Sequence, residues 1–246
     1  MAMTTIEARI AENLARIREE IEAACRRSGR SADDVLLVGV TKSADIDWIE
    51  SLVALGVRDL GESRPQQLLE RASALEGSRA AAGPIRWHLI GHLQRNKVRK
   101  VLTVAGCLHS IDSLPLAARI DAMSAELGLR PRLLLEVNVS GEGSKDGFLP
   151  DQVRTNWVEL CALAQVELAG LMTMAPLGDD AETARPTFRR LRMLRDELAA
   201  RPGSPPLGEL SMGMSGDFPV AIEEGATMIR VGTSLFDGLP ERAEST

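Results

Sequence analysis

A lysine follows a short apolar run that has the character of a buried strand. Residues 35–42 read VLLVGVTK, and their alternation places Lys42 on the same face as Val38 and Val40. At a strand end the ammonium group is expected to be partly desolvated, which favours the neutral amine that forms a Schiff base with a carbonyl compound. A lysine whose amine simply extends into water is the alternative interpretation.

Two later segments combine small residues with hydroxyl groups in a way that suits a phosphate group. They read SMGMSGD (211–217) and RVGT (230–233). Their glycines let a phosphate approach backbone amides, Ser215 and Thr233 add hydroxyl donors beside Gly232, and a helix starting near Asp217 points its positive end there. Glycines that only form tight turns are the alternative. Together with Lys42, this pattern favours a phosphorylated carbonyl cofactor, pyridoxal 5'-phosphate (PLP).

Arg230 shares strand parity with Gly232 and should point into the same site. A guanidinium facing the pyridine nitrogen would keep that nitrogen unprotonated. Arg230 is alternatively a phosphate ligand or the partner of an inward Glu136. The full predicted set of cofactor-binding residues is Lys42, His88, Asn138, Met214, Ser215, Arg230, Gly232 and Thr233.

The histidines do not predict a metal site. His88 and His92 are four residues apart, which on a strand is roughly 13 Å and too far to share an ion. Only one of them could pair with His109, and no third ligand follows in the sequence. His88 is therefore expected either to contact a ligand or to be a hydrogen-bonded core histidine.

These residues are spaced along about eight strand candidates that alternate with helices, which is typical of a parallel α/β fold. The expected strands are residues 35–42, 57–63, 85–91, 107–112, 132–140, 166–175, 207–213 and 228–236. Helices are expected over 4–27, 45–55, from 65, near 94, and over 114–127, 149–164, 183–200 and 218–225. The length of 246 residues favours a closed (β/α)8 TIM barrel.

Residues 1–246 are predicted to form a single domain. The helix within residues 1–30 should pack on the barrel where an eighth helix is missing, because the tail over 237–246 is too short to form one. Active sites of such barrels lie at the carboxyl ends of the strands, where Lys42, Asn138, Ser215 and Thr233 are expected.

Composition and charge exclude several classes of protein. The chain has 29 basic and 35 acidic residues and a net charge of −6, so the basic run QRNKVRK (94–100) is interpreted as a solvated helix face and not as a nucleic-acid site. No apolar run is long enough for a signal peptide or a membrane span. Three widely spaced cysteines without a CxxC pair indicate reduced thiols and a cytoplasmic protein.

The motifs resemble one known family. They are VTK (40–42), LGES (60–63), WHLIGHLQRNK (87–97), HSID (109–112), VNVSGEGSKDG (137–147), GLMTMA (170–175), LSMGMSGD (210–217) and GATMIRVGTSLF (225–236). Together they are similar to the YggS/PROSC family of PLP homeostasis proteins. Ser63 departs from the Asn that family members usually carry, so the resemblance implies no ring contact from that position.

The resemblance implies a barrel like the N-terminal domain of alanine racemase, with Lys42 in Schiff-base linkage to PLP. It also implies that Arg230 faces the pyridine nitrogen and that Ser215, Gly232 and Thr233 hold the phosphate. The implied role is binding and buffering of PLP, without an established catalytic turnover. Apo PLP-dependent enzymes would be the recipients, and the protein would be a monomer.

Two other functions compete with this one. A PLP-dependent amino-acid racemase of the related barrel type needs Lys and Tyr on opposite faces of the cofactor, with the Tyr on an additional β domain. The sequence contains no Tyr, although another base could support a weak side activity. A Schiff-base aldolase that uses Lys42 directly on a sugar phosphate explains the phosphate site but not Arg230.

Overall fold

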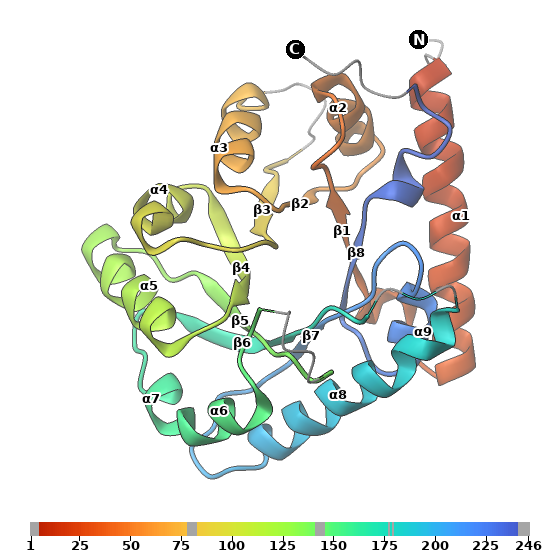
Figure 1. Cartoon of the computed structure of the whole chain (residues 1–246). Helices are drawn as coiled ribbons and strands as arrows, with labels where there is room; N and C mark the ends of the chain where they lie inside the picture. The colour runs from red at the N-terminus through yellow and green to blue at the C-terminus, as the bar shows by residue number, and fades with distance from the viewer. Residues whose placement is uncertain (1–4, 78–82, 141–145, 177, 179, 241–246) are drawn as a thin grey trace.

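Eight parallel strands close into a barrel in the order of the chain (Figure 1). The structure, a computed structural model, describes residues 5–77, 83–140, 146–176, 178 and 180–240. The strands are β1 (Leu36–Val40), β2 (Asp59–Glu62), β3 (Arg86–Leu89), β4 (Ala105–Ile111), β5 (Arg132–Glu136), β6 (Glu167–Met172), β7 (Glu209–Ser211) and β8 (Met228–Val231). The predicted (β/α)8 barrel is confirmed.

Helices surround this barrel (Figure 1). They are α1 (Thr5–Ser28), α2 (Ile46–Ala54), α3 (Pro65–Ala74), α4 (Val98–Leu102), α5 (Leu114–Leu127), α6 (Pro150–Thr155), α7 (Trp157–Cys161), α8 (Arg185–Ala199) and α9 (Phe218–Glu223). Short 3₁₀ turns are η1 (Ala32–Asp34), η2 (Arg95–Lys97), η3 (Ala181–Ala184) and η4 (Thr233–Leu235). In the part of the chain that is described, no helix has the length and apolar character needed to cross a membrane.

Several expected elements differ from those observed. The strands expected over 166–175, 207–213 and 228–236 are shorter, and the last ends at Val231 and is followed by η4. The helix predicted over 149–164 is divided at Asn156 into α6 and α7, where the Asn156 backbone departs from helical geometry with φ of −88° and ψ of 9°. The strand predicted over 132–140 ends at Glu136, after which Val137 keeps only an isolated bridge to Phe148. The motif that contains this segment also includes residues 141–145, which lie outside the described part.

The N-terminal helix packs against the helices that flank β1 and β8. α1 packs against α2, α9 and η4 and buries an apolar stripe of Ile10, Leu14, Ile17 and Ile21. The buried Asn13 amide donates hydrogen bonds to the carbonyl groups of Leu235 (3.1 Å) and Asp237 (2.9 Å). α1 therefore also anchors the segment that follows β8. Of the predicted tail over 237–246, residues 241–246 lie outside the described part.

The barrel interior has its own small apolar cluster, separate from the main core between strands and helices. It consists of Cys107, Leu134, Ala169, Met172 and Met228. Beside it are buried polar side chains from four strands, namely His88, His109, Ser211 and Arg230. Polar groups removed from water in this way need hydrogen-bond partners, and those partners define much of the site.

Candidate functional site

Lys42 lies in the turn that follows β1, beside the residues that follow β8. A pocket of about 450 Å³ is lined by Lys42, Gly232 and Thr233 together with Trp48 and Phe236. β1 and β8 are hydrogen-bonded neighbours, so closure of the barrel brings these distant residues together. The predicted partial burial of Lys42 is wrong: its side chain is exposed because it lies in a turn beyond the strand.

A buried ion pair holds the turn that carries Lys42. Arg71 of α3 donates to the Glu62 carboxylate and to the carbonyl oxygens of Thr41 and Ala44, and the Thr41 hydroxyl donates to the same carboxylate. Glu62 is 0% exposed and Arg71 is 7% exposed. The sequence reasoning missed Arg71, although the helical spacing of Leu68 and Arg71 placed it on the buried face of α3.

The predicted phosphate-binding residues also come together. Ser215 Oγ accepts hydrogen bonds from the backbone N–H groups of Gly232 (3.4 Å) and Ser234 (3.3 Å). A Cβ at Gly232 would lie 3.1 Å from Val40, and one at Gly213 would lie 2.6 Å from Ala221. Larger side chains at these positions would therefore collide with β1 and α9. The hydroxyl and amide groups gathered here fit a phosphate group.

Two further residues of this region are held close to α9. Met214 is half-buried, and its backbone N–H donates to the Asp217 carboxylate directly before the helix. Burial raises the pKa of Asp217, while hydrogen bonds from backbone N–H groups and the charge of Arg230 oppose that rise. The Asp217 side chain thus stabilises the turn from β7 into α9.

Arg230 is buried and bonded to neutral oxygens. Its Nη1 donates to Ser211 Oγ (2.6 Å) and its Nη2 to the Thr173 carbonyl (3.0 Å). Burial lowers the pKa of the guanidinium to about 10, so it keeps its charge at neutral pH. The suggested ion pair with Glu136 is wrong for the described residues, since that carboxylate acts on Arg230 only over a longer range. Neutral partners leave the positive charge available to a ligand.

Asn138 lies apart from Lys42. It follows β5, which is across the barrel from β1, and it is buried with its Oδ1 accepting from Ser140 Oγ (3.0 Å). Its contact with a cofactor stays a prediction. Ser63 is half-buried at the end of β2.

His88 sits inside the barrel, with both ring nitrogens bonded. Nδ1 is 2.9 Å from His109 Nε2, and Nε2 is 3.1 Å from Asp59 Oδ1. This geometry corresponds to the alternative of a hydrogen-bonded core histidine and does not support direct contact with a cofactor. Exposed His92 instead pairs with Asp112.

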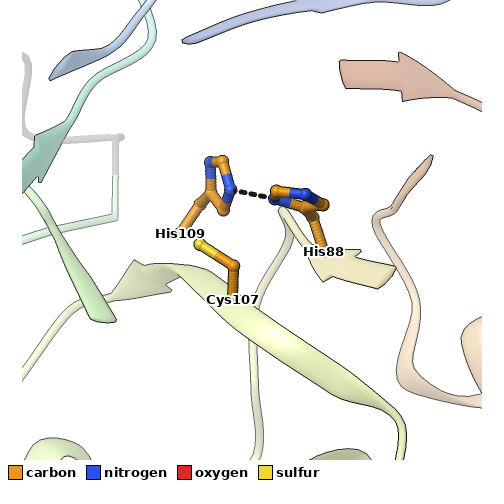
Figure 2. A group of neighbouring side chains, drawn as sticks. All are labelled: His88, Cys107 and His109. Atoms are coloured by element: carbon orange, nitrogen blue, oxygen red, sulfur yellow. Dashed lines mark hydrogen bonds between the residues drawn. The ribbon is translucent and has the colours of Figure 1, made fainter. Parts of the chain in front are cut away.

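A third potential metal ligand does exist beside the histidine pair. Figure 2 shows Cys107 next to His88 and His109, and the ligand atoms of all three lie within 4.8 Å of one another. The sequence expectation that no third ligand follows is therefore wrong. Cys107 and His109 are two residues apart on β4, so they face the same side of the strand.

Glu136 gives a prediction for the pH dependence of stability. Burial and the nearby charges of Asp146 and Asp112 raise its pKa from 4.5 to about 7. Folded Glu136 thus holds its proton more tightly than the unfolded chain, and stability falls as pH rises from about 4.5 to about 7.

Glu136→Gln removes this titration. At each pH the quantity of interest is the free energy of unfolding of the variant minus that of wild type. We expect this quantity to be about 2–3 kcal/mol larger at about pH 8 than at about pH 5, because only wild type loses stability between these pH values. Urea unfolding at both pH values measures this difference. The same difference between variant and wild type at both pH values would contradict the assignment.

The comparisons with known proteins agree with this geometry. Residues 9–240 match the family described as alanine racemase, N-terminal domain. The chain is 40% identical over 225 residues to the pyridoxal phosphate homeostasis protein of Aquifex aeolicus, covering 92% of this chain and 96% of that protein. The protein of the same name from Bos taurus is 35% identical over 229 residues, covering 89% and 84%. The chain belongs to the pyridoxal phosphate homeostasis protein family.

Solved structures extend the family likeness. PipY of Synechococcus elongatus PCC7942, determined with PLP bound, is 37% identical with a TM-score of 0.81 and covers 92% of this chain and 99% of that one. Alanine racemase of Clostridium difficile 630 has a TM-score of 0.67 at 16% identity, covering 93% of this homeostasis-family chain and 56% of the racemase. At that identity the likeness concerns the fold alone.

Proposed function

We propose that this chain binds PLP through a Schiff base on Lys42 and acts in intracellular PLP homeostasis as a carrier or buffer. The observation that carries the proposal is that Lys42, Gly232 and Thr233 line the same pocket. An amine and a set of phosphate donors at one opening suit a phosphorylated aldehyde. The PLP-bound structure of PipY and the names of the relatives support the same cofactor.

Different residues would contact different parts of the cofactor. Lys42 supplies the amine for the aldehyde carbon, while Ser215, Gly232 and Thr233 supply donors to the phosphate. Arg230 would present a charged guanidinium to the pyridine nitrogen, which would keep that nitrogen unprotonated. PLP itself supplies the electron-withdrawing ring, which is weaker as an electron sink in that state.

Ser215→Ala should weaken PLP binding about tenfold, because a hydrogen bond to a charged phosphate contributes about 1.5 kcal/mol or more. Equilibrium dialysis against PLP measures the change. Ser73→Ala, at an exposed position of α3, is the matched control and should bind as wild type does. Unchanged affinity in Ser215→Ala would remove this hydroxyl from the phosphate site.

The carrier role is distinguished from a racemase by proton exchange. The sequence supplies no Tyr as a second base, so we propose that the protein has no catalytic turnover. We further propose that apo PLP-dependent enzymes receive the cofactor and that the protein works as a monomer in the cytoplasm. The PLP-loaded protein is incubated with L- and D-alanine in deuterated water, and the α-proton is followed by NMR. Negligible exchange is expected, whereas efficient exchange with interconversion of the enantiomers would establish an enzyme.

A further inference from the structure

A continuous line of polar side chains crosses the interior of the barrel. Arg230 Nη1 is 2.6 Å from Ser211 Oγ, and Ser211 Oγ is 2.8 Å from His109 Nδ1. His109 Nε2 is 2.9 Å from His88 Nδ1, and His88 Nε2 is 3.1 Å from Asp59 Oδ1. We call Arg230, Ser211, His109, His88 and Asp59 the interior relay; all five are buried.

With both imidazoles neutral, the two ends of the interior relay fix the direction of every hydrogen bond in it. Arg230 can only donate, and an ionised Asp59 can only accept. A neutral imidazole has one donor and one acceptor nitrogen. His88 must therefore carry its proton on Nε2 to donate to Asp59. His109 must then donate from Nε2 to His88 and accept at Nδ1 from the Ser211 hydroxyl, which in turn accepts from Arg230.

The protonation states agree with this direction. Burial lowers the pKa of His109 well below 6.5, and the charge of Arg230 acts in the same sense, so the ring is neutral. Burial alone would raise the pKa of Asp59, but hydrogen bonds from His88 and Arg86 outweigh it and the pKa is lowered. A neutral His109 ring and an ionised Asp59 carboxylate are the states that these hydrogen-bond directions require.

The interior relay links the two ends of the barrel. Asp59 and Arg86 are the first residues of β2 and β3 and are paired in register, which places them at the amino ends of the strands. Arg86 closes that end with an ion pair to Asp59 while its own side chain is 61% exposed. Arg230 is paired in register with Val38, in the middle of β1, and its side chain donates to the carbonyl group of Thr173, which directly follows the carboxyl end of β6.

The same histidines with Cys107 are the obvious alternative, a metal site (Figure 2). Two nitrogen ligands of a tetrahedral ion at 2.0–2.1 Å would stand about 3.3 Å apart, and here they are 2.9 Å apart, a hydrogen-bond distance. Burial raises the pKa of the Cys107 thiol to about 12, so without a metal the thiol is protonated. The geometry favours the ordered hydrogen bonds.

We propose that Asp59, His88, His109 and Ser211 are positioning residues that fix the orientation of Arg230 toward the pyridine nitrogen of PLP. The inference rests on the proposed function for its cofactor, but the hydrogen bonds of the interior relay are present without PLP. Arg230 has one bond to the relay and one to the Thr173 carbonyl, so these two contacts hold the guanidinium plane. Loss of the relay contact leaves Arg230 charged and removes one of the two bonds that hold its guanidinium plane.

The first test is ¹⁵N NMR of the histidine rings in the protein without PLP. The chain has three histidines, so His92→Gln removes the exposed one and leaves the relay pair. We expect both remaining rings to be neutral at pH 7, each with its proton on Nε2. A proton on Nδ1 of either ring, a doubly protonated ring, or signals that change when a chelator removes bound metal would overturn the proposal. This measurement needs no relay variant to fold.

The second test asks whether the hydrogen bonds of the interior relay affect the environment of bound PLP. His109→Asn and Ser211→Ala each interrupt the hydrogen bonds of the interior relay while leaving Lys42 and the phosphate donors in place. We expect both variants to retain PLP, with a shifted visible absorption maximum and affinity reduced several-fold, whereas His92→Gln leaves the spectrum unchanged. An unchanged spectrum in a folded His109→Asn protein, checked by circular dichroism, would overturn the positioning role. Absence of a Lys42-dependent band in wild type would instead contradict the proposed function.

Discussion

Lys42→Ala should lose the visible absorbance of lysine-bound PLP and bind the cofactor at least about 100-fold more weakly, which corresponds to about 2.7 kcal/mol. The amine is the group in this pocket that can form a Schiff base, and the phosphate donors alone must then hold the ligand. Absorption spectroscopy during a PLP titration measures both quantities. The variant should fold normally, since Lys42 is exposed in a turn.

Two controls separate covalent linkage from charge. Lys42→Arg keeps a cation at the same turn but cannot form the Schiff base, so it should lose the absorbance as Lys42→Ala does. Lys97→Ala changes an exposed lysine of η2 and should behave as wild type. Wild-type absorbance in Lys42→Ala would assign the linkage to a different amine.

Arg71→Met should lower the free energy of unfolding by about 3–5 kcal/mol, the usual cost of leaving one charge of a buried pair without its partner. Glu62 would keep its carboxylate at 0% exposure with only the Thr41 hydroxyl bonded to it. One oxygen, Glu62 Oε2, already has no hydrogen-bond partner among the described residues. Denaturant unfolding monitored by circular dichroism measures the loss.

The same change should weaken PLP binding, because Arg71 bonds the carbonyl groups on both sides of Lys42. Adding Glu62→Gln to Arg71→Met removes the unpaired charge and should recover part of the stability but not the affinity. Arg119→Met, at an exposed position of α5, is the control. A stability loss below about 1 kcal/mol in Arg71→Met would contradict the structural importance of the pair.

Local sequence signals were sufficient for much of the fold. The helix predicted over 114–127 has the predicted bounds because Pro115 suits its first turn and Gly128 adopts the left-handed conformation, with φ of 66°, at its end. The grouping of Lys42 with Gly232 and Thr233 was also predictable. Closure of a barrel makes the first and last strands neighbours, so their ends meet.

Contacts that depend on register were not predictable. His88 and His109 meet through the stagger of β3 against β4, where the register shifts between Trp87 and His88. Pattern alone places both residues facing inward but does not set their relative height. The Arg71 contact likewise requires the packing of α3 on the turn after β1, which no local signal specifies.

The most direct test of the central claim is chemical trapping of the linkage in the wild-type protein. PLP-loaded protein is reduced with borohydride, which converts the carbon–nitrogen double bond to a stable amine, and is then digested and mapped by mass spectrometry. We predict one modified position, Lys42. Modification confined to another lysine, or no modification at saturating PLP, would contradict the account.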